Sequence, residues 1–160
     1  MTPLAALRVA DGDVVLRRAT VEDVPAIVRL LAADQLGAAR DDPADLAPYL
    51  AAFAVIDADP AQLLVVATAG DSVVGTLQLT VIPGLARRGA LRAQIEAVRV
   101  AGSHRSAGLG AAMIGWVVAE ARRRGCSLVQ RTTDKSRADA HRFYRRLGFA
   151  ASHEGFKLIL

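Results

Sequence analysis

The chain has 160 residues, of which 52% are apolar and 22% charged, and its 20 basic and 16 acidic residues give a net charge of +4. This length and composition predict one globular domain spanning residues 1–160, because the chain is long enough to bury a core without covalent staples. Cys126 is the single cysteine, which excludes an internal disulfide. With only three histidines besides, no metal-ligand spacing is present and no metal is expected.

The amino-terminal stretch has no charged region leading into an apolar core, and no run approaches the roughly 20 apolar residues that span a bilayer. A cytoplasmic protein without membrane contact is therefore expected. Basic residues are scattered apart from the three arginines at 122–124, which is typical of a solvated face. Nucleic acid is accordingly not an expected partner.

The first part of the chain alternates strand-like and helix-like segments, which predicts an α/β (α+β) fold. Residues 14–19 are predicted to form a strand, and Thr20 with Asp23 makes a capping box that opens a helix. Asp42 is predicted to cap a second helix with Pro43 in its first position. Apolar residues recur at helical spacing in both segments: Val24, Ile27, Val28 and Leu31, then Leu46, Leu50 and Phe53.

The middle of the chain predicts a hairpin followed by a central strand. Residues 62–82 form two apolar runs joined at Gly70 and Asp71, a pair typical of tight turns. After a polar loop at 83–92, residues 93–100 have the pattern of a strand covered on both sides. Strict alternation along this strand assigns Ile95 and Ala97 to one face, and Val98 and Val100 to the other.

The last part predicts a helix from Gly108 to about Arg124, ended by Gly125, and then a strand at 126–133. Ser136 with Asp139 forms a second capping box before another helix, which stops at Gly148. The final segment, residues 152–160, is predicted to be a closing strand.

The turn between the central strand and the long helix is predicted to bind an anion. A helix that begins at Gly108 leaves several backbone amides without partners, and these amides favour negatively charged ligands. Gly108 and Gly110 allow close approach to the backbone, while Arg105 adds a permanent positive charge. The spacing matches neither common nucleotide-binding glycine motif, so a phosphate or pyrophosphate in another setting is expected.

The segment from Arg105 to Gly110 resembles the R/Q-x-x-G-x-G/A motif of the GNAT N-acetyltransferase superfamily. A second family signature is present as FYRRLGF at 143–149, and the order of elements is similar over roughly the whole chain. The resemblance implies a single domain with a mixed, mostly antiparallel sheet, one splayed pair of strands and about four flanking helices.

It also implies acetyl-CoA as co-substrate and a role for particular residues. The backbone around Val98 and Val100 would pair with the pantetheine arm, Tyr144 would act as general acid, and Glu96 would act as general base. The pyrophosphate would lie against the amides of Arg105, Ser106, Ala107, Gly108, Leu109 and Gly110. Tyr144 as a core residue and Glu96 as a solvated strand residue are the alternative interpretations.

The chemistry itself requires such groups, because a protonated amine cannot attack a thioester and a departing thiolate gains from a nearby donor. The sequence therefore predicts acetyl transfer from acetyl-CoA to a primary amine of a small molecule or peptide, by direct attack in a ternary complex. A CoA-binding sensor without transfer activity and a basic nucleic-acid module are the alternatives. A longer acyl group and a homodimer are left open.

One position departs from the family pattern, and the acceptor is not determined. Arg137 stands where relatives carry an asparagine that touches the cofactor, so it either reaches a cofactor phosphate or points to solvent. Charges of both signs lie in the segments expected to form the acceptor site: Asp41, Asp42 and Glu154 to attract an amine, and Arg87, Arg88 and Arg92 to hold a carboxylate or phosphate.

Overall fold

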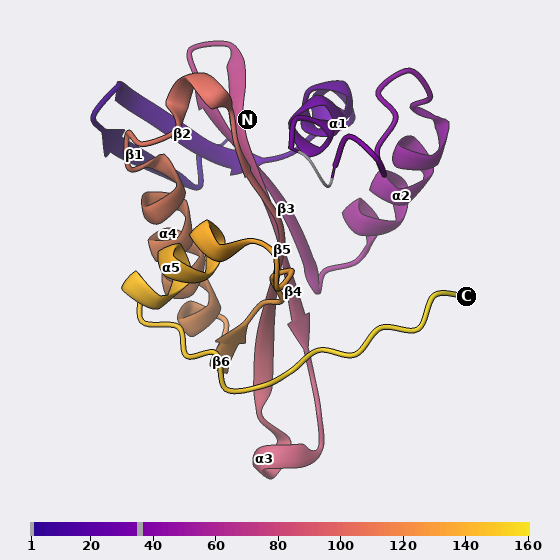
Figure 1. Ribbon diagram of the computed structural model, residues 1–160, viewed down its shortest axis with the longest axis vertical. Helices are drawn as coiled ribbons and strands as arrows, with labels where there is room; N and C mark the ends of the chain where they lie inside the picture. Colours follow the sequence, from indigo (N-terminus) through magenta and orange to yellow (C-terminus); the bar gives the residue numbers. More distant parts are fainter. Residues whose placement is uncertain (1, 35–36) are drawn as a thin grey trace.

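The computed structural model describes residues 2–34 and 37–160, and six strands of this part form one sheet in the order β1-β2-β3-β4-β5-β6. Four successive pairs are antiparallel, whereas β5 and β6 are parallel (Figure 1). The strands are β1 (Ala5–Val9), β2 (Gly12–Arg18), β3 (Gln62–Ala69), β4 (Ser72–Ile82), β5 (Leu91–Val100) and β6 (Cys126–Gln130). The predicted mixed, mostly antiparallel sheet is confirmed, with β1 as a strand that the sequence analysis missed.

Helices cover both faces of the sheet (Figure 1). They are α1 (Val24–Ala32), α2 (Ala47–Ala58), the short α3 (Ala86–Gly89), α4 (Leu109–Arg123) and α5 (Ala138–Arg146). The helices α1 and α2 lie on one face, while α4 and α5 lie on the other. No helix of the described residues is long and apolar enough to cross a membrane.

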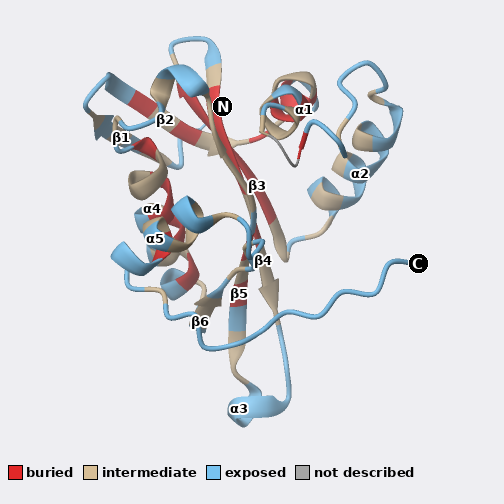
Figure 2. Cartoon of the chain, in the orientation of Figure 1, coloured by how far each residue is buried: buried red, intermediate tan, exposed pale blue. Residues whose placement is uncertain are grey.

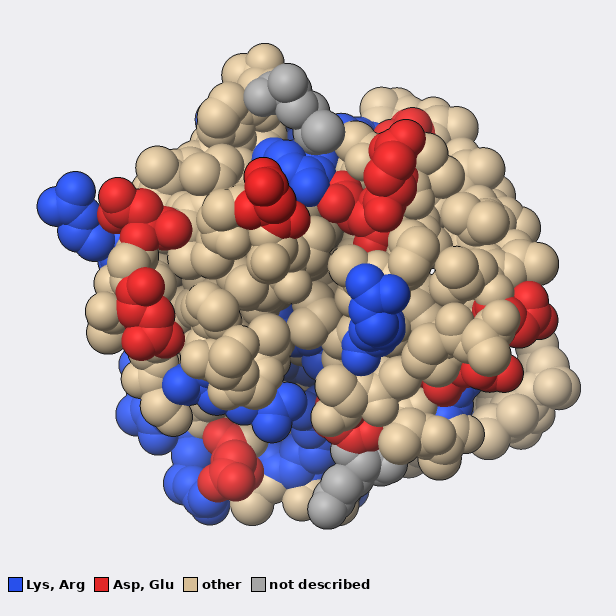
Figure 3. Space-filling model, turned by 90° about the horizontal axis from the view of Figure 1, so that it is seen from above, with Lys and Arg blue, Asp and Glu red and all other residues tan. Residues whose placement is uncertain are grey.

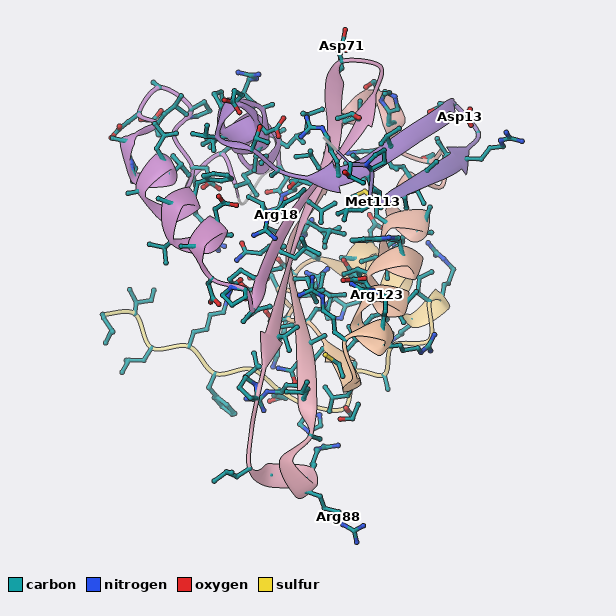
Figure 4. All side chains as sticks on the ribbon, turned by 180° about the vertical axis from the view of Figure 1, so that it is seen from behind. Asp13, Arg18, Asp71, Arg88, Met113 and Arg123 are labelled. Atoms are coloured by element: carbon teal, nitrogen blue, oxygen red, sulfur yellow. The ribbon has the colours of Figure 1, made fainter. Side chains whose placement is uncertain are left out.

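The larger core lies between the sheet and α4 (Figure 2). Met113, on the inner face of α4, is fully buried and points toward the sheet (Figure 4). A Cβ atom added to Gly75 in β4 would lie 3.0 Å from the Met113 sulfur, so this glycine leaves room for the helix to pack closely. Fully buried side chains from both layers meet here: Leu16, Leu77, Leu79 and Ile95 of the sheet, with Leu109 and Val117 of α4.

The start of α1 is fixed by a buried carboxylate. Asp23 accepts two hydrogen bonds from the Arg17 guanidinium, at 2.6 and 2.7 Å, and one from the backbone amide of Thr20 at 2.8 Å. The predicted capping box is thus confirmed. Burial raises the pKa of Asp23, but its bonds to Arg17 and Thr20 outweigh burial and hold that pKa below its usual value. The ion pair therefore stabilises the fold at neutral pH, and this stabilisation is lost as the pH falls through the lowered pKa.

Two predicted helix starts are wrong. The Ser136 hydroxyl donates to Asp134 at 2.6 Å instead of capping the helix, and α5 begins one residue after Arg137, its N-cap. The helix α2 begins at Ala47, with Leu46 as its N-cap. In both places the short polar side chain bonds within a local turn, which competes with helix capping.

The predicted closing strand is also wrong. Residues 152–160 form no strand, and the side chains of Phe156, Leu158 and Ile159 are 93%, 87% and 94% exposed. This segment runs across the molecule and away from it (Figure 1). An alternating apolar pattern gives residues 152–160 only the propensity for a strand. A strand also needs hydrogen bonds to the edge of a neighbouring strand, and the tail pairs with none.

Candidate functional site

The strands β5 and β6 separate halfway along β5 and leave a wedge. Their parallel pairing runs from Leu91 with Cys126 to Gln94 with Gln130, where β6 ends. Since β5 continues to Val100, its later half has no strand on the β6 side within the described chain. Backbone groups along this half of β5 can therefore bond to a ligand in the wedge.

A bulge in β5 decides which side chains face the wedge. Thr76 pairs with Arg99 and Gln78 with Glu96, so Ala97 and Val98 together lie opposite a single β4 residue. Ala97 has a φ of 53°, in the left-handed region that side chains other than glycine rarely adopt. The extra residue reverses the alternation of side chains along the strand.

The reversal corrects the face assignment made from the sequence. Val98 and Val100 pack against the same α4-side core that holds Ile95, instead of the opposite face. Glu96, before the bulge, and Arg99, after it, consequently share the face covered by α1. Glu96 is exposed, and its side chain makes no hydrogen bond or ion pair with any described residue.

The turn that precedes α4 has the geometry of an anion site. Ser106 and Gly108 are left-handed, with φ of 68° and 86°, and alternate with Ala107. Within the described chain, the amides of Ser106, Ala107 and Gly108 donate to no backbone carbonyl. Alternating backbone of this kind, followed by a helix N-terminus, forms a concavity lined with amide hydrogens.

The remaining residues of the motif frame this turn. Arg105 is exposed and its Nε lies 3.4 Å from the Val100 carbonyl oxygen, at the end of β5. Leu109 is fully buried and anchors the first turn of α4 in the core. A Cβ atom added to Gly110 would lie 3.5 Å from Phe143, so Gly110 brings α4 close to the second signature.

Tyr144 lies on α5 and is 8% exposed. Its ring makes edge contacts with Phe143 and Phe149 at centroid distances of 5.0 and 5.5 Å, and the Arg131 guanidinium lies 4.0 Å from its centroid. Burial raises the pKa of the Tyr144 phenol, and the nearby arginine charges only partly oppose this. The phenol is therefore neutral at physiological pH and keeps the proton that a general acid donates.

Arg137 forms an ion pair in the described chain, and its contact with a cofactor phosphate stays a prediction. One of its guanidinium nitrogens lies 3.5 Å from the Asp34 carboxylate, which also pairs with Arg99 at 3.2 Å. Sequence reasoning missed Arg99, Arg131 and Asp34 as site residues. These three charges lie far apart along the chain, so the sequence does not indicate that the bulge and the ion pairs of Asp34 bring them together.

The charged residues expected around the acceptor do not gather at the wedge. Arg88 extends from the tip of the β4–β5 hairpin, far from α4 (Figure 4). Asp41 and Asp42 line a shallow hollow of about 440 Å³ formed by residues 38–43. Glu154 pairs with Lys135 at the surface, at 3.1 Å.

The comparisons with known proteins identify the family of this chain. The sequence profile of the Acetyltransferase (GNAT) family matches residues 25–149. The chain belongs to this family. GNAT acetyltransferases use acetyl-CoA as the acetyl donor, so the protein is assigned to the acetyltransferases.

Two solved structures are similar over nearly the whole chain. A protein of Bacillus halodurans described as a transcriptional regulator is 43% identical, with a TM-score of 0.88 over 92% of this chain and 99% of that one. An Agrobacterium tumefaciens protein described as a putative acetyltransferase is 27% identical, with a TM-score of 0.81 over 91% of this chain and 99% of that one.

A curated relative matches a shorter stretch. The aminoalkylphosphonate N-acetyltransferase of Salmonella typhimurium is 40% identical over 52 residues, which are 32% of this chain and 34% of that enzyme. The match thus spans about a third of that enzyme's length.

Substitution of Gly108 by valine tests the turn. A β-branched residue disfavours the left-handed backbone by about 1–2 kcal/mol, so the amides that line the turn should shift and CoA affinity should fall about tenfold or more. Isothermal titration calorimetry with CoA measures this loss. Gly70→Val is a matched control, because Gly70 is also left-handed, with a φ of 56° in the β3–β4 turn and open space at its Cβ position. Unchanged CoA affinity in folded Gly108→Val protein would rule out the turn as the site.

Proposed function

We propose that the protein is an N-acetyltransferase that transfers the acetyl group of acetyl-CoA to a primary amine of a small molecule or peptide. Both substrates bind together, and the amine attacks the thioester directly. The observation that carries this proposal is the wedge beside β5, which has an amide-lined turn at one end and a buried, neutral phenol beside it.

The cofactor would follow the wedge from the turn inward. Its pyrophosphate would accept hydrogen bonds from the turn amides of residues 106–108, with Arg105 able to swing from the Val100 carbonyl to a phosphate oxygen. The pantetheine arm would bond to the unpaired edge of β5 near Val98 and Val100. This arrangement would bring the thioester toward the bulge and its neighbour Glu96.

The reaction requires the ammonium nitrogen to lose two protons and the departing thiolate to gain one. Glu96 would accept a proton from the incoming ammonium group through a water molecule, which frees the nitrogen lone pair for attack on the thioester carbonyl. The carbon–nitrogen bond then forms while the carbon–sulfur bond breaks. Tyr144 would give its proton to the departing thiolate. The nitrogen then loses its second proton to become the amide, and this proton restores the Tyr144 phenol, so no covalent enzyme intermediate is needed.

A CoA-binding regulatory module is the second candidate. It is favoured by one observation, the description of the 43% identical Bacillus halodurans relative as a transcriptional regulator. Such a module would use the same turn and wedge without turnover. The proposed enzyme and the module therefore differ in catalysis and not in cofactor binding.

Release of free CoA thiol separates the two candidates. The proposed enzyme should release thiol from acetyl-CoA only when an amine acceptor is added, and mass spectrometry should detect the acetylated amine. The acceptors tried should include aminoalkylphosphonates, on which the Salmonella typhimurium relative is named to act. Tight CoA binding by calorimetry without thiol release from any amine of the panel would favour the regulatory module.

Glu96→Gln tests the proposed base. The substitution keeps the shape of the side chain but removes its capacity to accept a proton, so turnover should fall roughly 10²–10⁴-fold while CoA affinity stays nearly unchanged. The deficit should shrink as the pH rises toward the pKa of the amine, because more acceptor then arrives without its extra proton. Steady-state rates from pH 6 to pH 10 check this. A small loss that is uniform across this range would show that Glu96 is not the base.

Tyr144→Phe tests the proposed acid. The ring contacts with Phe143 and Phe149 remain, so the melting temperature should change little, whereas turnover should fall on the order of 10–10³-fold. The deficit should narrow with an acyl donor whose thiol is more acidic, since that leaving group needs less protonation. Wild-type turnover on acetyl-CoA with the best amine would show that the hydroxyl has no catalytic role.

A further inference from the structure

Three arginines from separate segments converge around Tyr144. Arg99 lies on β5 after the bulge, Arg131 directly follows β6, and Arg137 caps α5. All three charges act on the Tyr144 phenol, and Arg99 and Arg137 also act on Arg131. The cluster therefore lies where the wedge opens, next to the proposed acid.

The charges of this cluster are not balanced within the described residues. Asp34 is the carboxylate that pairs with Arg99 and Arg137, and its side chain is only 16% exposed. Arg131 instead donates to the Thr132 carbonyl, at 3.1 and 2.7 Å, and lies against the face of the Tyr144 ring. Arg99 and Arg137 thus share one carboxylate, and Arg131 forms no ion pair with a described residue.

Burial makes this excess of positive charge unfavourable. Burial is the largest influence on Arg131 and lowers its pKa, and the neighbouring arginines lower it further. A guanidinium group remains charged in spite of such a shift, so it cannot relieve the cost by losing its proton. A bound anion would offset the repulsion between the buried positive charges. The planar guanidinium group matches the oxygens of a phosphonate, phosphate or carboxylate.

The position of the arginine cluster indicates which of the two substrates carries this anion. The phosphates of CoA belong to the turn at 105–110, beyond the end of β5, in the function proposed above. Arg99 instead shares the α1 face of β5 with Glu96, three residues away, which corresponds to about 7–10 Å along a strand. Seen from above, Lys and Arg side chains gather in the lower left part of the surface (Figure 3).

We propose that the acceptor is a short amine that also carries an oxyanion group, and that Arg99, Arg131 and Arg137 bind that group while Glu96 faces the amine. This inference rests on the proposed function. Two to four bonds between nitrogen and the anionic group suit the spacing of Arg99 and Glu96. Aminoalkylphosphonates and short amino acids with a terminal amine belong to this class, whereas neutral alkylamines and polyamines do not.

The test compares acceptors that differ only in the anionic group. Steady-state kcat and KM are measured for 2-aminoethylphosphonate, 3-aminopropanoate and the neutral ethanolamine. The wild-type protein should use the better of the two anionic amines with a kcat/KM at least about 100-fold above that of ethanolamine. Equal kcat/KM values for anionic and neutral amines would overturn the inference while leaving the proposed function intact.

Single substitutions then assign the residues. Arg131→Gln and Arg137→Gln should each raise KM for the anionic amine about 10–100-fold with little change for ethanolamine, and Arg131→Lys should recover part of the loss. Arg8→Gln is the control, because Arg8 is 89% exposed on β1 at the other edge of the sheet. A fall in kcat of the same size for both amines would show that the arginines act on the fold or on the leaving group instead.

A binding measurement separates this inference from the proposed function. Calorimetric titration of 2-aminoethylphosphonate into the CoA-saturated protein should show binding that Arg131→Gln weakens about tenfold or more, whether or not acetyl transfer occurs. Binding of this kind without turnover of any amine would refute the proposed enzyme but support the anion site. Turnover of amines with no response of binding or KM to Arg131→Gln would refute the anion site alone.

Discussion

The bulge of β5 at Ala97 and Val98 controls the candidate site. By placing two residues opposite one on β4, it turns Val98 and Val100 onto the α4 core and leaves Glu96 and Arg99 together on the α1 face. Without the extra residue, Arg99 would point into an apolar layer where its charge could not be paired. The left-handed φ of Ala97 shows that the backbone carries local strain to obtain this arrangement.

The same strand defines the wedge. Because β6 ends at Gln130 while β5 runs on to Val100, half of β5 is left with an unpaired edge. An unpaired edge is normally a hazard in a sheet because it can pair with another strand, but the backbone groups of this edge can instead bond to an extended ligand. The turn that follows directly at residues 105–110 then offers amide hydrogens to the anionic end of such a ligand.

Rigid packing supports both ends of the site. The helix α4 is held against the sheet by fully buried Leu109, Met113 and Val117, so the turn at its N-terminus is placed by the core and not by the loop alone. On the other face, the bonds from Arg17 and Thr20 to Asp23 fix where α1 begins, and Asp34 follows the end of that helix. Asp34 in turn links Arg99 to Arg137 across the opening of the wedge.

The sequence by itself determined the features that depend on interactions between residues close together in the chain. The two signatures, the glycine turn before α4, the hairpin at Gly70 and the capping box at Thr20 all depend on residues close together in the chain, and the family assignment follows from them. Tertiary structure decided what depends on distant partners. The bulge arises from pairing between β4 and β5, the arginine cluster from three segments brought together around Tyr144, and residues 152–160 remain unpaired because a strand forms only against an available edge. The periodicity of the sequence specifies which residues prefer burial or an extended backbone, but it does not specify which segments pack together. The chemistry of the proposed acceptor site depends on contacts between such distant segments.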